Sequence, residues 1–125
     1  MHEVQFSEKS MIFNQGEPSD CCFRILSGQV EIHLARRGLM NRNETTVLAT
    51  FGPGEIIGEM GAIAGGTRSA SAIATQPTIC QRLSPDEIVE RLENNPQEAM
   101  SYVRTLIRRI RTSNKSLSLD ARLSG

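Results

Sequence analysis

The chain has 125 residues, 38% of them hydrophobic, which is long enough for one domain with a buried core and too short for two. Lysine plus arginine and aspartate plus glutamate both number 14, so the zero net charge gives no basic signature for nucleic acid or an anionic membrane. No apolar run approaches the roughly 20 residues that span a bilayer, and the N-terminus lacks a signal pattern. We therefore expect a single cytoplasmic domain over residues 1–125 that contacts neither nucleic acid nor membrane.

The cysteines and histidines offer little for metal or nucleophilic chemistry. Cys21, Cys22 and Cys80 are an odd number without Cys-x-x-Cys spacing, which argues against a disulfide framework and for a reducing compartment. His2 and His33 lie apart from acidic or cysteine clusters, so we predict no metal site and no enzyme. The alternating pattern around His33 is typical of an exposed or edge-facing histidine on a strand.

Short runs rich in Val, Ile, Phe and Thr occupy residues 4–83, separated by turn residues such as Gly16-Glu17-Pro18 and Gly52-Pro53-Gly54. Such spacing is typical of antiparallel strands. The many short strands favour a closed antiparallel β-roll or jelly roll. The predicted strands are Met11–Asn14, Cys22–Leu26, Gln29–Ala35, Thr45–Phe51, Ser69–Thr75 and Thr78–Leu83.

The stretch from Gly52 to Ala74 has the chemistry of a phosphate cradle. Its glycines let backbone N–H groups approach anionic oxygens, and Arg68 adds a planar guanidinium that can donate two hydrogen bonds to one phosphate. Glu59 would repel a phosphate, so we assign it to the hydroxyls of a sugar. These residues predict a nucleotide with one sugar and few phosphates. The glycines are Gly58, Gly61, Gly65 and Gly66.

The periodicity changes after Leu83. Ser84-Pro85-Asp86-Glu87 combines a serine cap, a proline at the first helical position and a glutamate three residues after the cap, which predicts a helix over about 85–93. Asn95-Pro96-Gln97-Glu98 repeats this arrangement and predicts a second helix over about 96–117, roughly 33 Å long. The predicted fold class is mainly β with two C-terminal helices.

One stripe of the second helix has the spacing of a coiled-coil seam. Its residues recur at steps of four, three, four and three and include a polar asparagine, which favours a parallel homodimer. Packing of the same stripe on the protein's own β-roll is a nearly equal interpretation. A basic stripe on another face is typical of a solvated surface. The seam residues are Val103, Ile107, Ile110, Asn114 and Leu117, and the basic residues are Arg104, Arg108, Arg111 and Lys115.

Several motifs, taken in order, resemble the cyclic nucleotide-binding domain family over nearly the whole chain. They are Gly16-Glu17, Ile25-Leu26-Ser27-Gly28-Gln29-Val30, Gly52-Pro53-Gly54-Glu55, Gly58-Glu59-Met60 and Thr67-Arg68-Ser69-Ala70. The resemblance implies a β-roll with a short helix inside a phosphate-binding cassette and two C-terminal helices. In that family, a ribose-binding acidic residue precedes the phosphate-binding arginine by about nine residues, as Glu59 precedes Arg68 here.

The resemblance also implies roles for the residues of the cassette. Arg68 should bind the exocyclic oxygens of the cyclic phosphate, and Glu59 should bind the ribose 2′-hydroxyl. Gly61 and Ala62, at the start of the cassette helix, should donate backbone N–H groups to the phosphate. Ser69 should add its N–H group and its hydroxyl, and a serine at this position leaves the choice of base open. The cassette residues are Gly58, Glu59, Met60, Gly61, Ala62, Arg68 and Ser69.

The second helix resembles that of bacterial catabolite activator-type regulators. By this resemblance Ser113 contacts the base of the ligand in its own chain, and Asn114 reaches the ligand of the partner across a dimer seam. The helical wheel agrees, because it places Ser113 and Asn114 on different faces. Arg109 lies on the side of Ser113 and is expected to pair with Glu59.

Two features depart from the family. Ile57 and Gly61 stand where an aromatic residue and an alanine are common, which would reshape the cassette without removing its polar groups. Catabolite activator-type regulators continue into a helix-turn-helix, whereas none follows before Gly125. We therefore expect a stand-alone sensor or an excised regulatory domain.

The predicted function is a non-enzymatic regulatory sensor whose ligand is cAMP, ahead of cGMP, and which needs no cofactor. Binding would reposition the C-terminal helix relative to the β-roll. The main alternative is a dimerisation or interaction domain of the same fold that no longer binds nucleotide. A cupin-like metalloenzyme would need several converging histidine and carboxylate ligands, which two separated histidines do not supply.

Overall fold

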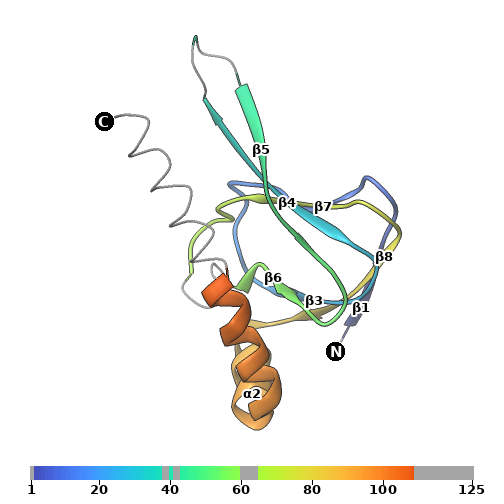
Figure 1. The fold of residues 1–125 in the computed structure, drawn as a ribbon, viewed down its shortest axis with the longest axis vertical. Coiled ribbons are helices and arrows are strands. Elements are labelled where there is room, and N and C mark those ends of the chain that lie inside the picture. The colour runs from blue at the N-terminus through green and yellow to red at the C-terminus, as the bar shows by residue number, and fades with distance from the viewer. Residues whose placement is uncertain (1, 38–39, 41–42, 60–64, 109–125) are drawn as a thin grey trace. The chain divides into compact units, whose positions relative to one another are not determined.

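Short strands separated by turn residues pair into two antiparallel sheets. The computed structural model describes residues 2–37, 40, 43–59 and 65–108. Within these residues, one four-stranded sheet has the order β1-β8-β3-β6 and the other the order β2-β7-β4-β5 (Figure 1). The predicted antiparallel β-roll is confirmed. The strands are β1 (His2–Phe6), β2 (Met11–Phe13), β3 (Cys22–Ser27), β4 (Val30–Arg37), β5 (Asn43–Phe51), β6 (Ile56–Ile57), β7 (Ser71–Ala74) and β8 (Thr78–Leu83).

The turn between β3 and β4 carries the chain from one sheet to the other. Gly28 has a φ of 101°, and a Cβ atom there would collide with the hydroxyl of Thr78. That hydroxyl accepts a 3.2 Å hydrogen bond from the backbone N–H of Gln29. The turn therefore requires glycine at position 28, and the buried Thr78 stabilises it through this hydrogen bond.

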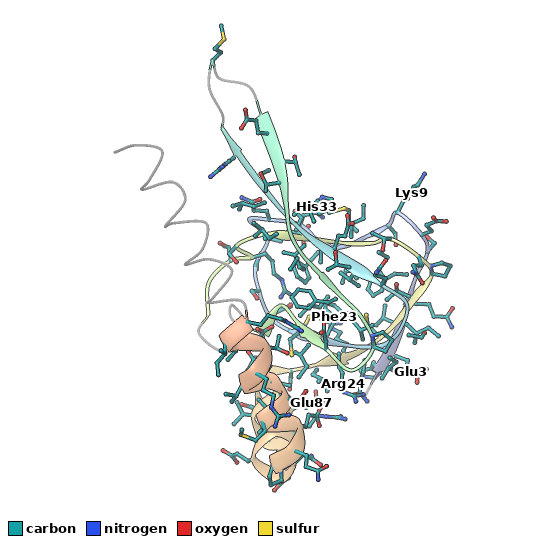
Figure 2. The ribbon with its side chains drawn as sticks, in the orientation of Figure 1. Glu3, Lys9, Phe23, Arg24, His33 and Glu87 are labelled. Carbon is teal, nitrogen blue, oxygen red and sulfur yellow. The ribbon has the colours of Figure 1, made fainter. Side chains whose placement is uncertain are left out.

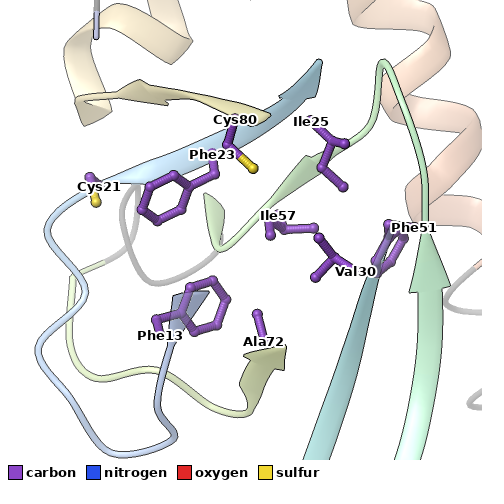
Figure 3. Packing of buried hydrophobic residues seen from close by; sticks show 9 residues of the cluster. All are labelled: Phe13, Cys21, Phe23, Ile25, Val30, Phe51, Ile57, Ala72 and Cys80. Atoms are coloured by element: carbon purple, nitrogen blue, oxygen red, sulfur yellow. The ribbon is translucent and has the colours of Figure 1, made fainter. Parts of the chain in front are cut away.

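The core of the β-roll lies between the two sheets. Phe23 is central to it, since its ring meets Phe6 edge-on at 5.9 Å and stacks on Phe13 at 6.4 Å between centroids. Figure 2 shows Phe23 inside the roll and Glu3 and Lys9 on its outside. The alternation of apolar and polar residues along the strands thus becomes an inner and an outer face. The buried cluster in Figure 3 is Phe13, Cys21, Phe23, Ile25, Val30, Phe51, Ile57, Ala72 and Cys80.

Strands β4 and β5 form a long hairpin that extends beyond the rest of its sheet (Figure 1). Their register runs from Val30 opposite Phe51 to Arg37 opposite Asn43, whereas β7 pairs with β4 only as far as His33. Beyond that point the side chain of Gln15 takes the place of a strand. It accepts a 2.9 Å hydrogen bond from the backbone N–H of Ala35 and donates a 3.0 Å bond to the Ala35 carbonyl.

Some strand details differ from the sequence-based expectation. The sequence does not single out β1 or the two-residue β6, because β1 is polar and forms a sheet edge and β6 is shorter than any recognisable pattern. His33 is expected to be exposed or at an edge, but it is partly buried on β4, between β5 and β7. Its Nε2 atom lies 2.9 Å from Oε1 of Glu31, because residues two apart on a strand share a face.

Helix α2 (Pro85–Asn94) begins with the predicted capping box. The backbone N–H of Glu87 donates to Oγ of Ser84, and the backbone N–H of Ser84 donates to Oε1 of Glu87, both at 3.1 Å. Residues 96–108 are also helical, and the rest of the predicted second helix lies outside the described residues. The chain divides into two compact units, Met1–Val89 and Glu90–Gly125. Over its described part, no helix is both long enough and apolar enough to cross a bilayer.

Candidate functional site

Arg68 is buried inside the β-roll, with only 6% of its surface exposed. Its Nη1 atom donates a 3.0 Å hydrogen bond to the carbonyl oxygen of Gly58, and Nη2 donates to Sγ of Cys21 at 3.5 Å. The guanidinium carbon lies 4.3 Å from the centre of the Phe13 ring, a cation–π contact. The Nε atom is fully buried and has no hydrogen-bond partner among the residues that the structure describes. Arg68 is therefore a permanent buried cation with unused donor capacity.

The backbone around Arg68 is held by the loop between β2 and β3. The backbone N–H of Arg68 donates to the carbonyl of Glu17 at 2.8 Å, and the Arg68 carbonyl accepts from Gly16 N–H at 2.9 Å. Nearby, Ser19 N–H donates to the Gly66 carbonyl at 3.0 Å. The loop and the arginine segment thus form a short ladder of their own, which fixes Arg68 before any ligand arrives.

Gly58 allows the close approach of the Arg68 guanidinium. Its φ is 78°, and a Cβ atom there would come within 2.5 Å of Nη1 of Arg68 and 3.1 Å of the Phe13 ring. An L-residue would be strained by the backbone conformation and would also collide with the arginine. The glycine that the sequence assigns to a phosphate cradle is needed here to admit Arg68.

Glu59 is buried even more completely, at 1% exposure. Glu59 and Arg68 both act electrostatically on one buried group, the Cys22 thiol. Burial, and after it the negative charge of Glu59, raise the pKa of Cys22 to about 12, although the positive charge of Arg68 acts in the opposite direction. A buried carboxylate and a buried guanidinium therefore act on the same interior region of the β-roll.

The predicted site residues fall into two groups. The structure places Gly58, Glu59 and Arg68 inside one compact unit, and Ser69 follows Arg68 with an exposed side chain. The predicted contacts to the base of the ligand stay predictions, as does the backbone part of the cradle. The predicted residues that lie outside the described ones are Met60, Gly61, Ala62, Arg109, Ser113 and Asn114.

Sequence reasoning did not identify the residues that hold the Arg68 side chain. Phe13 and Cys21 come from β2 and from the residue before β3, far from Arg68 in the sequence. In sequence both look like ordinary core residues, and no local pattern marks them. Gly16-Glu17 is a recognisable turn, but its pairing with Arg68 depends on the tertiary fold.

The chemistry of these side chains suits a small anion that also carries hydroxyl groups. A guanidinium with free donors binds phosphate oxygens, and a carboxylate accepts hydrogen bonds from hydroxyls. Across the described ranges, no three His, Cys, Asp or Glu side chains are grouped so that they could hold a metal ion.

Comparison with known proteins points in the same direction. A family model described as "Cyclic nucleotide-binding domain" matches residues 3–95. The "Cyclic AMP receptor protein" of Thermus thermophilus is 32% identical over 108 residues, which are 86% of this chain and 48% of that protein. The "CRP-like cAMP-activated global transcriptional regulator" of Mycobacterium tuberculosis is 28% identical over 118 residues, 94% of this chain and 51% of that protein. The chain thus spans about half the length of these relatives.

Solved structures extend the comparison to the fold. The cAMP-bound form of the EAL enzyme Bd1971 superposes with a TM-score of 0.65 at 29% identity, over 95% of this chain and 30% of that one. These relatives therefore include a transcriptional regulator and a larger enzyme, each with a region similar to this chain.

Proposed function

Because this chain belongs to the cyclic nucleotide-binding domain family, we propose that it binds a cyclic nucleotide at the site around Arg68. One observation carries the proposal: Arg68 is 6% exposed, and its buried Nε atom has no partner within the described part of the chain. A buried charge is costly unless it is paired, so this cation fits an anionic ligand. A cyclic phosphate carries one negative charge and two exocyclic oxygens, which suits one guanidinium.

With the cyclic phosphate at Arg68, the remaining residues of the cassette would contact other parts of the same ligand. Glu59 would accept hydrogen bonds from the ribose 2′-hydroxyl, which explains why a carboxylate is buried in the same region as Arg68. Gly58, with its positive φ, would turn the backbone so that the following N–H groups meet the phosphate. The proposed donors to the phosphate are the backbone N–H groups of Met60, Gly61, Ala62 and Ser69.

We propose cAMP ahead of cGMP as the ligand. Support comes from relatives whose names specify cAMP, and from the cAMP-bound form of Bd1971. Bd1971 has also been solved in a cGMP-bound form, so affinities for both nucleotides need to be measured. Ser113 and Asn114 would contact the base, and Arg109 would pair with Glu59.

The output of binding would be a change in the position of the C-terminal helix. A ligand that contacts both Arg68 and Ser113 favours the arrangement in which both contacts form. We further propose a homodimer through this helix. Val103 and Ile107 support the dimer, because they are 42% and 45% exposed although they are large and apolar.

Isothermal titration calorimetry tests the proposed function directly. The protein is titrated with cAMP, with cGMP and with 5′-AMP, which has the same base and sugar but an open phosphate. We expect heat and saturation with cAMP, weaker binding of cGMP, and the weakest binding of 5′-AMP. No heat and no thermal stabilisation at millimolar cAMP and cGMP would contradict the proposal and favour an interaction domain that binds no nucleotide.

A variant pair locates the binding site. Arg68→Lys removes the bidentate guanidinium and should weaken cAMP binding on the order of tenfold to a hundredfold. Arg104→Lys makes the same change on an exposed position of the helix and should leave the affinity unchanged. Equal affinities of the wild type and Arg68→Lys would remove Arg68 from the site.

A further inference from the structure

The segment from Phe13 to Cys21 contacts Arg68 both at its backbone and at its side chain. Glu17 and Gly16 form hydrogen bonds of 2.8 and 2.9 Å with the backbone of Arg68. Phe13 lies against the guanidinium at 4.3 Å, and Cys21 accepts a hydrogen bond from it. A single stretch of chain thus helps to hold both the backbone of Arg68 and its guanidinium.

Cys21 occupies a specific place in this arrangement. Cys21 is 6% exposed and belongs to the buried cluster shown in Figure 3. Its sulfur interacts with Arg82, and this contact raises the pKa of Arg82 above its ordinary value. The sulfur of Cys21 therefore interacts with two guanidinium groups, one of which is Arg68.

The two acceptors of Arg68 fix the plane of its guanidinium. Nη1 is held by the carbonyl of Gly58 at 3.0 Å and Nη2 by the sulfur of Cys21 at 3.5 Å. A planar group held at two nitrogens cannot rotate about its long axis, so its other donors keep one direction. Without the sulfur, the guanidinium would keep the Gly58 carbonyl and the Phe13 ring as contacts among the described residues, but Nη2 would lose its acceptor.

We propose that Cys21 is a positioning residue of the phosphate site, which holds the Arg68 guanidinium in its binding orientation without touching the ligand. This inference rests on the proposed function. The free energy of binding improves when the ordering of a side chain is complete before the ligand arrives. Loss of the sulfur therefore weakens binding even where the fold is intact.

Cys80 provides a matched control, because it separates the hydrogen bond between Cys21 and Arg68 from the contribution of a cysteine to core packing. It is a fully buried cysteine of the same hydrophobic cluster. Burial raises the pKa of Cys80 to about 11 with no contribution from a neighbouring charge, which sets its surroundings apart from those of Cys21. Cys21→Ala and Cys80→Ala delete the same atom from the same core, but only Cys21→Ala removes an acceptor from Arg68.

The experiment combines a binding measurement with a signal from Arg68 itself. We expect Cys21→Ala to weaken cAMP binding about three- to tenfold, whereas Cys80→Ala leaves it unchanged. Cys21→Ser, which keeps an acceptor, should bind within about twofold of the wild type. If Cys21→Ala does not fold, Cys21→Val takes its place, because it refills the volume without an acceptor.

The NMR signal of the Arg68 Nε–H group is assigned by its loss in Arg68→Lys. It reports the orientation of the Arg68 guanidinium in the ligand-free protein. It should shift in Cys21→Ala and stay in place in Cys80→Ala. Equal affinity losses in the two alanine variants, or an unmoved Arg68 signal, would overturn the role of Cys21. A wild type that binds no cyclic nucleotide would overturn the proposed function, and the Arg68 signal alone would then decide whether Cys21 positions Arg68.

Discussion

Nη1 of Arg68 donates a 3.0 Å hydrogen bond to the carbonyl oxygen of Gly58, at a position where a Cβ atom would come within 2.5 Å of the same nitrogen. Gly58 thus gives the arginine both an acceptor and the space to reach it. The φ of 78° adds a second requirement for glycine, because side-chain-bearing residues rarely adopt that conformation. The proposed phosphate site and the local fold consequently depend on one residue.

Gly58→Ala should lower both stability and ligand affinity. The positive φ alone should reduce the free energy of unfolding by about 1–2 kcal/mol, and displacement of Arg68 should weaken cAMP binding about tenfold. Gly54→Ala is the control, because Gly54 has a φ of 88° and, among the described residues, no atom within 4 Å of a Cβ placed there. Chemical denaturation and calorimetry on both variants separate the two effects. An unchanged affinity in Gly58→Ala would show that Arg68 does not depend on this glycine.

Arg68→Met should separate binding from stability. The change removes a buried cation, whose burial is costly while it is unpaired, and keeps an apolar chain of similar length. We expect the ligand-free variant to unfold at the same free energy as the wild type or up to about 2 kcal/mol higher. It should also lose its stabilisation by cAMP, which thermal denaturation with and without the ligand measures. A large loss of stability without ligand would mean that Arg68 serves the fold rather than the ligand.

The sequence predicts those parts of the structure that depend on local patterns. Alternation of apolar residues indicates β3 and β8, and Ser84 with Glu87 marks the start of α2, because strands and helix caps carry short-range signals. The nine-residue spacing of Glu59 and Arg68 also lies within one stretch of chain. Local information was therefore enough to predict the fold class, and it is the basis on which Glu59 and Arg68 are proposed as site residues.

The sequence does not predict contacts that arise only when the two sheets close. Cys21 and Arg68 are 47 residues apart, and neither has a feature that points to the other. The first strand is a similar case, because His2–Phe6 becomes a strand by pairing with β8 (Thr78–Leu83), which lies far from it in the sequence. Long-range pairing decides both features, and no short sequence window contains them.

The Cys22 thiol should make stability fall at alkaline pH. Burial, and after it the charge of Glu59, raise its pKa from an ordinary value of 9.0 to about 12. The folded protein therefore keeps the proton longer than the unfolded chain, and the stabilisation is complete below about pH 9 and lost as the pH rises toward 12. Chemical denaturation across this pH range should show a smaller decline in the free energy of unfolding for Cys22→Ala than for the wild type. Parallel curves would mean that this thiol does not titrate differently on folding.

The capping box at the start of α2 should make stability depend on pH in the acidic range, with the opposite sign to the effect of Cys22. Hydrogen bonds from the backbone and side chain of Ser84 hold the pKa of Glu87 below its ordinary value of 4.5. Their stabilisation is present above pH 4.5 and is lost as the pH falls through the lowered pKa. Glu87→Gln should flatten this part of the stability curve, and Ser84→Ala should cost about 1 kcal/mol near neutral pH. Glu90→Gln changes an exposed residue later in α2, and it should neither flatten the acidic part of the stability curve nor lower stability near neutral pH.

The exposed apolar stripe on residues 96–108 should support a dimer that a single charge disrupts. Val103 and Ile107 are 42% and 45% exposed, so a carboxylate at Val103 would not disturb the core of the monomer. In a seam between two copies, Val103→Glu would bury two like charges and should weaken the dimer at least about tenfold. Ser101→Glu adds the same charge on another face of the helix and should leave the dimer intact. Sedimentation velocity over a concentration series measures the oligomeric state of the wild type and the two variants. A wild type that stays monomeric at concentrations on the order of 100 μM, far above the dissociation constants of specific homodimers, would rule out this interface.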